Sequence, residues 1–246
     1  MLYEFLPLAG RWPMRPRPRA ESASKIMMIP GFMAGDASLY PLATALRGMG
    51  HRVFFAGIWS NMDCPRQTIE RLSRALESAF DIGGRKVVVV GHSLGGIYAR
   101  ELARRFPPLI ERTILLGSAI REPLDNSNPF VRMWFMATRR RHHEGDTCLE
   151  HMSLLCGAHR SDPAPEIAET IVYSRRDAVV DWRSCIESGP NVEAIEVRAG
   201  HNSMPFSPEV FAIVAERAKR TDHRHQHSHK ARPQLENPAS EAAAVP

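Results

Sequence analysis

Short apolar runs alternate with amphipathic stretches along most of the chain, beginning at Lys25. Runs rich in β-branched residues are typical of strands, and apolar positions repeating every three or four residues are typical of helices. The pattern predicts strands over residues 25–29, 52–56, 86–90, 113–117, 167–173 and 192–197. It predicts helices over residues 38–48, 65–80, 95–106 and 208–220.

The run from Val87 to Val90 contains no polar residue. A strand of this kind is covered on both faces, as in parallel sheets with helices on either side. Because strands and helices also alternate along the chain, the fold class is α/β. We expect a mostly parallel sheet of about six strands flanked by helices.

One connection is too long for this alternation. Close to fifty residues, about 119–166, separate two predicted strands and include an apolar stretch with Trp134 and Met136. This stretch fits an ordinary outer helix, and it equally fits a small cap that closes over a pocket for an apolar group. Long insertions in compact domains tend to be functional, which favours the cap and makes Trp134 and Met136 candidate substrate-binding residues.

The two ends of the chain differ from the middle. Residues 1–24 form an Arg/Pro-rich segment that favours extended backbone, residues 25–220 form the α/β domain, and residues 221–246 form a His-rich tail for which we expect disorder. Alternate histidines in the tail can bind a metal, but a solvated tail is the favoured interpretation because ordering it costs much entropy.

The chain has 246 residues and a formal net charge of +5. Residues 1–25 and 217–246 each carry a net +3, so the remaining residues carry a net −1. The positive charge is therefore terminal. Neither end interleaves aromatic residues with its basic ones, so no nucleic-acid partner is expected, while peripheral contact with an anionic membrane surface stays open.

No apolar run approaches the roughly 18 residues that a transmembrane helix needs. The first ten residues contain Glu4 and Pro7 and lack the basic start of a signal peptide, so we expect a cytoplasmic protein. Four cysteines without a C-x-x-C pair give no metal motif, and we expect them to be mostly reduced.

The sequence Gly91-His92-Ser93-Leu94-Gly95 directly follows the all-valine strand and opens a predicted helix. The G-x-S-x-G pattern alone is weak evidence, and a serine in a glycine-rich turn is the plain alternative. In a strand–turn–helix context, however, such a turn holds the serine in strained backbone with its hydroxyl projecting above the sheet edge. Ser93 is therefore the candidate nucleophile.

A serine hydroxyl needs a base to take its proton and a carboxylate to orient that base. His201 follows the last predicted strand, at the carboxyl edge where open α/β sheets bind ligands. Asp177 follows the preceding strand and is the candidate acid, whereas Asp181 begins a short predicted helix and fits a helix cap. The chain order Ser, Asp, His favours Asp177.

The other histidines fit the role of base less well. His92 abuts the serine but is expected to point elsewhere on the turn, and His51 precedes a strand, at the opposite edge of the sheet. Solvated or structural roles are expected for the histidines of the insertion, which are His142, His143, His151 and His159.

The loop after the first predicted strand is a candidate part of the oxyanion hole. The backbone N–H groups of Phe32 and of Leu94 are candidate donors to a developing oxyanion. In the alternative interpretation, Gly31 and Gly35 only turn the chain into the next helix. Met33 adds an apolar side chain in this loop and is a further candidate substrate-binding residue.

Four motifs together resemble the α/β-hydrolase superfamily, specifically its small bacterial esterase- and lipase-like members. The motifs are Pro30-Gly31-Phe32, Gly91 to Gly96, Tyr173 to Asp177, and Gly200-His201. The resemblance covers about residues 25–220. The chain departs from the family in having Pro-Gly where His-Gly is usual, and in lacking evident first antiparallel strands within residues 1–24.

The resemblance implies a serine hydrolase that cleaves a small-molecule ester with an apolar acyl group of short to medium length. Ser93, His201 and Asp177 are then the triad, an acyl-enzyme is the intermediate, and neither a metal nor an organic cofactor is needed. The same apparatus serves thioesterases and acyltransferases, and a non-catalytic binding protein on the same scaffold is the alternative from another class. The resemblance leaves the oligomeric state open.

Overall fold

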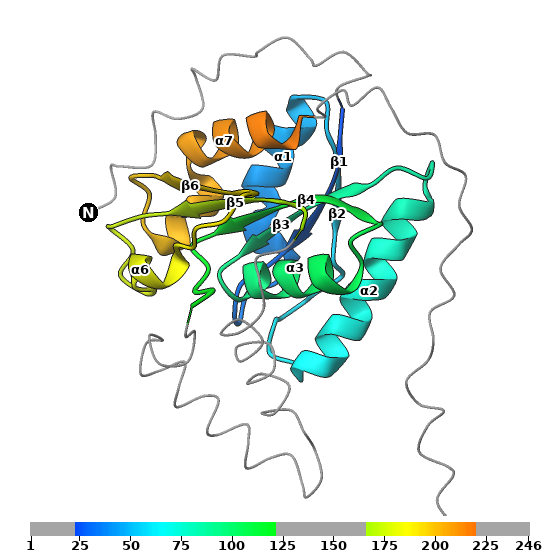
Figure 1. The fold of residues 1–246 in the computed structure, drawn as a ribbon, viewed down its shortest axis with the longest axis horizontal. Coiled ribbons are helices and arrows are strands. Elements are labelled where there is room, and N and C mark those ends of the chain that lie inside the picture. Colours follow the sequence, from blue (N-terminus) through cyan, green and yellow to red (C-terminus); the bar gives the residue numbers. More distant parts are fainter. Residues whose placement is uncertain (1–22, 122–165, 220–246) are drawn as a thin grey trace, which may run out of the picture.

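A six-stranded sheet forms the centre of the protein in a computed structural model that describes residues 23–121 and 166–219 (Figure 1). The strands are β1 (Lys25–Ile29), β2 (Arg52–Phe55), β3 (Val87–His92), β4 (Ile110–Leu116), β5 (Ala168–Tyr173) and β6 (Val192–Glu196). The helices are α1 (Tyr40–Gly48), α2 (Pro65–Asp81), α3 (Leu94–Arg105), α6 (Trp182–Cys185) and α7 (Pro208–Ala218), with 3-10 turns η2 (Asp36–Leu39) and η3 (His201–Phe206).

Every neighbouring pair of strands is parallel, in the order β2-β1-β3-β4-β5-β6. The α/β fold with six strands is thereby confirmed. β1 has the predicted bounds, the bounds of the other strands differ from the prediction, and the differences are largest in β4 and β3. β4 begins at Ile110 rather than at residue 113. Glu111 and Arg112 interrupt the apolar pattern, but Ile110 and Arg112 pair with Val87 and Val88 of β3, and Glu111 lies at the irregularity between these two pairs. β3 continues through His92, so the strand reaches the residue before Ser93.

The sheet reverses its winding direction at β1. From β1 the chain moves to one side to form β2, and it then crosses over to form β3 on the other side. In open parallel sheets, the carboxyl ends of two strands at such a switch point diverge and leave a crevice that binds ligands. The loop after β1 and the turn after β3 therefore meet at the place where a site is expected.

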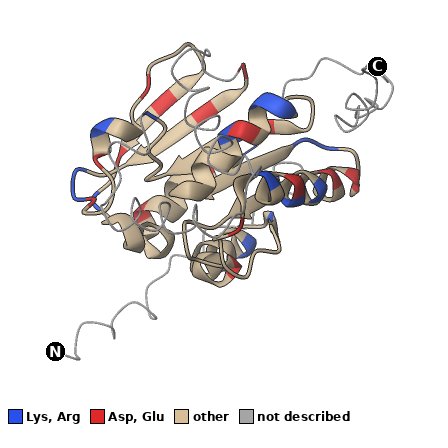
Figure 2. Ribbon diagram, turned by 90° about the horizontal axis from the view of Figure 1, so that it is seen from below, with Lys and Arg blue, Asp and Glu red and all other residues tan. Residues whose placement is uncertain are grey.

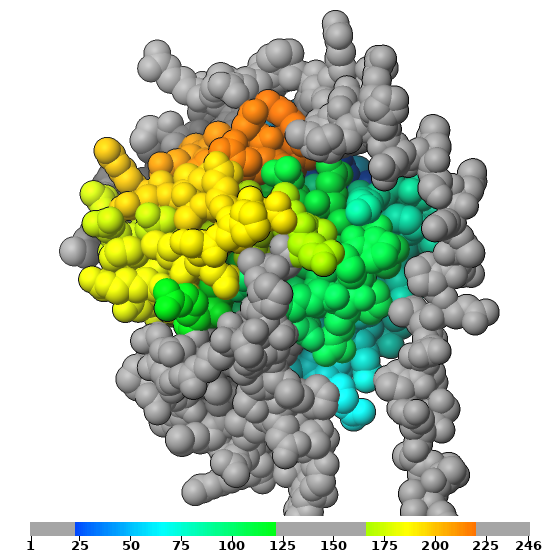
Figure 3. Space-filling view, viewed as in Figure 1, coloured from blue at the N-terminus to red at the C-terminus, as the bar shows by residue number. Residues whose placement is uncertain are grey.

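Helices cover both faces of the sheet, with α1 and α7 on one face and α2 and α3 on the other (Figure 1). The alternation of side chains along β1 shows why. Ile26 and Met28 pack with α1 and α7, while Met27 and Ile29 pack with α2 and α3, and all four are fully buried. On the face in Figure 3, the green surface that precedes residue 121 and the yellow surface that follows residue 166 adjoin each other. This agrees with the pairing of β4 with β5.

Residues of both charge signs occur along the helices, as the blue and red bands of the ribbon show (Figure 2). The side chains of Lys25, Arg100 and Glu169 are buried, and Lys25 lies at the amino end of β1. Its Nζ donates hydrogen bonds to the carbonyls of Ala79 and Phe80, at 2.9 and 3.0 Å, near the end of α2. A cation placed there satisfies helix carbonyls that lack partners in the helix.

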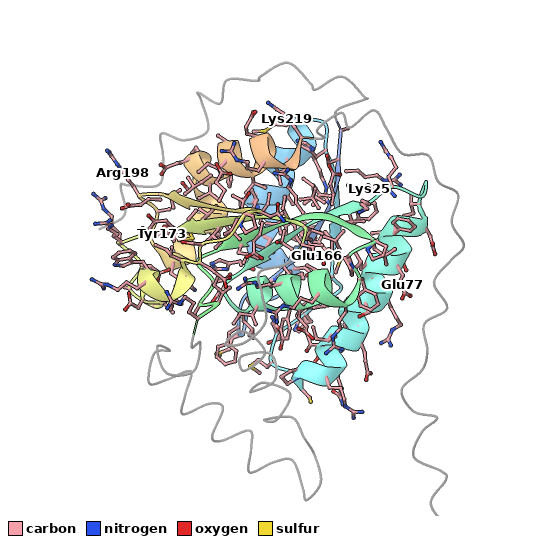
Figure 4. All side chains as sticks on the ribbon, in the orientation of Figure 1. Lys25, Glu77, Glu166, Tyr173, Arg198 and Lys219 are labelled. Carbon is pink, nitrogen blue, oxygen red and sulfur yellow. The ribbon has the colours of Figure 1, made fainter. Side chains whose placement is uncertain are left out.

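Tyr173 and Arg198, at the carboxyl ends of β5 and β6, lie on the opposite side of the picture from Lys25 (Figure 4).

The predicted cap and both predicted terminal segments fall largely or wholly outside the described residues, as do Trp134, Met136, Cys148 and Cys156, so these expectations stay predictions. In the part of the chain that is described, no helix is long and apolar enough to cross a membrane.

Candidate active site

The turn between β3 and α3 has the strained geometry that a nucleophile elbow requires. Ser93 has φ 53° and ψ −121°, a region that side-chain-bearing residues rarely occupy. The neighbouring glycines permit close contact, since an ideal Cβ on Gly91 would lie 2.2 Å from the carbonyl oxygen of Gly95. One on Gly95 would lie 2.2 Å from the carbonyl oxygen of Ile29. Both positions therefore exclude any side chain.

Asp177 and His201 lie together at the carboxyl edge of the sheet. Nδ1 of His201 is 2.7 Å from Oδ2 of Asp177, and both side chains are buried. The other carboxylate oxygen, Oδ1, accepts hydrogen bonds from the backbone N–H groups of Val179 and Val180, each at 2.8 Å. Burial alone would raise the pKa of Asp177, but these hydrogen bonds and the His201 ring together hold the pKa below its usual value. The carboxylate is thereby fixed in orientation and kept ionised.

Asp181 has a different role. It is the N-cap residue of α6, where its Oδ1 accepts a hydrogen bond from the backbone N–H of Arg183 at 3.0 Å. The helix cap expected from the sequence is confirmed. Asp181 is thus engaged with its own helix, and the nearby carboxylate that contacts His201 belongs to Asp177.

Gly117, at the end of β4, lies directly beneath the Asp–His pair. Its φ is +57°, and an ideal Cβ there would lie 3.2 Å from each of three atoms: Asp177 Oδ2, His201 Nδ1 and Met204 Sδ. Its backbone N–H donates to the carbonyl of Val172 on β5. Sequence reasoning missed this residue, because β4 supplies no catalytic side chain and the crowding arises from other strands.

The loop after β1 lies against the elbow. An ideal Cβ on Gly31 would be 3.1 Å from Cβ of Ser93, so the backbone of this loop passes close to the serine. Phe32 follows Gly31 in this loop, and Leu94 is the first residue of α3, where backbone N–H groups have no partner within the helix. The two segments that carry the expected oxyanion donors therefore flank Ser93.

Asn61 holds this loop in shape. Its Nδ2 donates to the carbonyl of Pro30 at 2.8 Å, and its backbone exchanges hydrogen bonds with Met33 N–H and the Ala34 carbonyl. Met33 itself has a left-handed φ of 59°. No sequence pattern indicates Asn61, since it lies in a loop after β2 and its partners are far away along the chain.

Large apolar side chains are exposed in the loops at this edge. Trp59 is 95% exposed, Phe206 56%, Met33 50% and Met62 41%. Of the three candidate substrate-binding residues from the sequence, Met33 belongs to this set, whereas Trp134 and Met136 fall outside the described residues.

The remaining reactive residues are accounted for by packing. His51 lies at the amino edge, where its Nδ1 accepts a hydrogen bond from the backbone N–H of Ser24. Cys64 and Cys185 are buried free thiols, and burial, together with the charge of Asp177, raises the pKa of Cys185 to about 12. Within residues 23–121 and 166–219, no three metal-ligating side chains gather around a common point.

Comparison with known proteins relates this geometry to other chains. The model of the alpha/beta hydrolase family matches residues 26–193. Among solved structures, an esterase from Pyrococcus furiosus has a TM-score of 0.56 at 16% identity, with 80% of this chain and 82% of that chain covered. A carboxylesterase from Bacillus subtilis has a TM-score of 0.52 at 16% identity, with 79% and 82% covered.

A pyrethroid hydrolase from Sphingobium faniae JZ-2 has a TM-score of 0.53 at 17% identity, with 80% of this chain and 98% of that chain covered. At these identities the likeness concerns the fold. No curated protein sequence gives a significant match.

Proposed function

Because the chain belongs to the alpha/beta hydrolase family, we propose that it is a serine esterase that hydrolyses small carboxylic esters with short to medium acyl chains. The observation that carries the proposal is the 2.7 Å hydrogen bond between His201 and Asp177, at the same sheet edge as the strained Ser93. A nucleophile, a base and a group that orients the base are the requirements of acyl transfer through a serine.

The hydrogen bond to Asp177 assigns the roles of the two nitrogens of His201. A carboxylate only accepts, so Nδ1 of His201 carries the proton and its Nε2 has a free lone pair. In the proposed first step, Nε2 takes the proton of Ser93 as the hydroxyl oxygen attacks the ester carbonyl. The Asp177 carboxylate then stabilises the imidazolium that has formed, and the low pKa of that carboxyl keeps it charged.

The negative oxygen of the tetrahedral intermediate is assigned to the N–H groups of Phe32 and Leu94. As the intermediate collapses, the alcohol leaves with the proton from Nε2 of His201, and the acyl group stays on Ser93. Water deprotonated by the same Nε2 then attacks the acyl-enzyme and releases the acid. One oxyanion donor typically accounts for about 10² to 10³ in rate. The residues of this mechanism need no metal or organic cofactor.

The exposed apolar side chains around the site support an apolar acyl group in the substrate. A pocket of limited length gives a rate that is maximal at an intermediate acyl chain, because each buried CH₂ adds about 0.8 kcal/mol of binding until the pocket is full. We therefore expect hydrolysis of p-nitrophenyl esters to peak between acetate and palmitate. A flat profile over that range would contradict a shaped acyl pocket.

Substitution of the three proposed residues tests the chemistry. Ser93→Ala is expected to abolish ester hydrolysis and labelling by a fluorophosphonate probe, which reacts only with an activated serine. Asp177→Asn is expected to lower kcat by about 10² to 10⁴, by analogy with other triads, because the amide no longer stabilises the imidazolium. Asp181→Asn is the matched control and is expected to retain activity. Undiminished hydrolysis by purified Ser93→Ala protein would refute the proposal.

A further inference from the structure

His92 joins the strand of the nucleophile to the segment of the base. It is the last residue of β3, directly before Ser93, and its side chain is 7% exposed. Its Nε2 lies 3.0 Å from the backbone carbonyl oxygen of His201, a contact between residues 109 positions apart. The centres of the two imidazole rings are 5.0 Å apart.

The bond determines which nitrogen of His92 carries the proton. A carbonyl oxygen only accepts, so Nε2 is the donor, and Nδ1 of the neutral ring has no hydrogen. Burial, together with the neighbouring His201 ring, lowers the pKa of His92 to about 4, so the ring is neutral under ordinary conditions. Nδ1 is itself buried and has no hydrogen-bond partner among the described residues.

The segment that carries His201 is otherwise bonded mainly to itself. In η3, the N–H groups of Ser203 and Met204 both donate to the carbonyl of Gly200. The Asp177 carboxylate holds the ring of His201. The bond from His92 therefore restrains the His201 backbone relative to β3, which ends at the elbow.

We propose that His92 is a positioning residue that fixes the separation of Ser93 and His201 through its Nε2–H bond to the His201 carbonyl. The inference rests on the proposed function, in which these two residues are nucleophile and base. It goes beyond that function in assigning a role to a side chain outside the proposed triad and the proposed oxyanion donors. Because a misplacement of about 1 Å in a reacting group can cost about 10²-fold in rate, loss of the bond has a measurable effect.

Three substitutions of His92 distinguish the effect of its Nε2–H donor from the effect of the volume of its ring. His92→Gln places an amide N–H near the position of Nε2, His92→Asn places one near the position of Nδ1, and His92→Leu offers no donor. We expect His92→Gln to keep kcat within about threefold of wild type, and the other two variants to lose about 10- to 100-fold in kcat with KM nearly unchanged. The rate of fluorophosphonate labelling at Ser93 is expected to follow the same order.

A role in folding alone predicts a different result. All three variants would then unfold at lower temperature while the labelling rate of the folded protein stayed at the wild-type value, and that outcome would overturn the proposal. Equal kcat for His92→Leu and wild type would overturn it as well. If the wild-type protein neither hydrolyses esters nor reacts with the probe, the proposed function fails and the positioning role fails with it.

The tautomer provides a measurement that needs no variant. In the full-length protein at neutral pH, ¹⁵N NMR of the imidazole nitrogens is expected to find the His92 proton on Nε2. A proton on Nδ1 would overturn the proposal even if the variants at this position fail to fold.

Discussion

The buried, neutral ring of His92 predicts how stability depends on pH. The folded state holds this group at a pKa of about 4, compared with 6.5 for an ordinary histidine. Between these two values the unfolded chain binds a proton at this position and the folded protein does not. Acid therefore favours the unfolded state, and the contribution of His92 to stability falls as the pH drops from about 6.5 towards 4.

The size of the effect follows from the two pKa values. At pH 5 most unfolded chains are protonated at this position and most folded molecules are not, which lowers the free energy of unfolding by about 2 kcal/mol relative to pH 8. His92→Gln removes the titrating group but keeps a hydrogen-bond donor. We therefore expect the variant to lose about 2 kcal/mol less than wild type between pH 8 and pH 5.

Urea unfolding at the two pH values measures this difference. With a slope of about 2 kcal/mol per molar urea, 2 kcal/mol corresponds to a shift of about 1 M in the difference between midpoints. His51 is a second buried histidine whose pKa burial lowers, so His51→Gln is expected to reduce the acid loss independently, at the opposite edge of the sheet. Equal acid sensitivity of His92→Gln and wild type would refute the assignment of a buried neutral ring.

Three further predictions concern other parts of the fold. Gly117→Ala is expected to lower the free energy of unfolding by about 1 to 2 kcal/mol through its left-handed backbone, and to lower kcat about 100-fold because the methyl group crowds the proposed acid and base. Gly84→Ala, with φ +58° and open space around the residue, is the control and should lose only stability. Equal kcat in both variants would contradict the crowding. Asn61→Ala is expected to lower the free energy of thermal unfolding by about 1 to 3 kcal/mol and to slow fluorophosphonate labelling. An unchanged labelling rate would show that the loop keeps its shape without this side chain. Arg100→Met leaves the buried carboxylate of Glu169, 3.4 Å from Arg100, without that partner, and is expected to lower the free energy of unfolding by about 3 to 5 kcal/mol in chemical denaturation. Adding Glu169→Leu should restore most of this loss. An Arg100→Met variant as stable as wild type would contradict this reasoning.

The fold was predictable because its determinants are local. The all-valine run of β3 and the amphipathic pattern of α2 each depend on neighbouring residues. α2 forms within one residue of its predicted bounds and β3 within two. The start of β4 was missed because Glu111 and Arg112 are polar. They are tolerated there since their side chains are only partly buried. Tertiary pairing with β3 therefore extends the strand beyond its apolar pattern.

The candidate site was predictable only in part. Ser93, Asp177 and His201 were predicted from chain order and from the ends of the strands, which a sequence reveals. Asn61 and His92 act through contacts that no local pattern encodes, because their partners lie far away along the chain. His92 was expected to point away from the chemistry, and in the structure it instead binds the backbone of His201.

Backbone strain at the candidate site lowers the stability of the fold at the residues on which the proposed activity depends. Among the described residues, the non-glycine residues with left-handed φ are Met33 and Ser93, which lie in the loop beside the elbow and in the elbow itself. Such a conformation costs about 1 to 3 kcal/mol. Glycine relieves this strain, and its own entropic cost on folding is only about 0.5 to 1 kcal/mol. Laboratory selection for thermal resistance alone would therefore favour glycine at both positions, including that of the proposed nucleophile. Under the proposed function, serine at position 93 is retained by selection for turnover, against selection for stability.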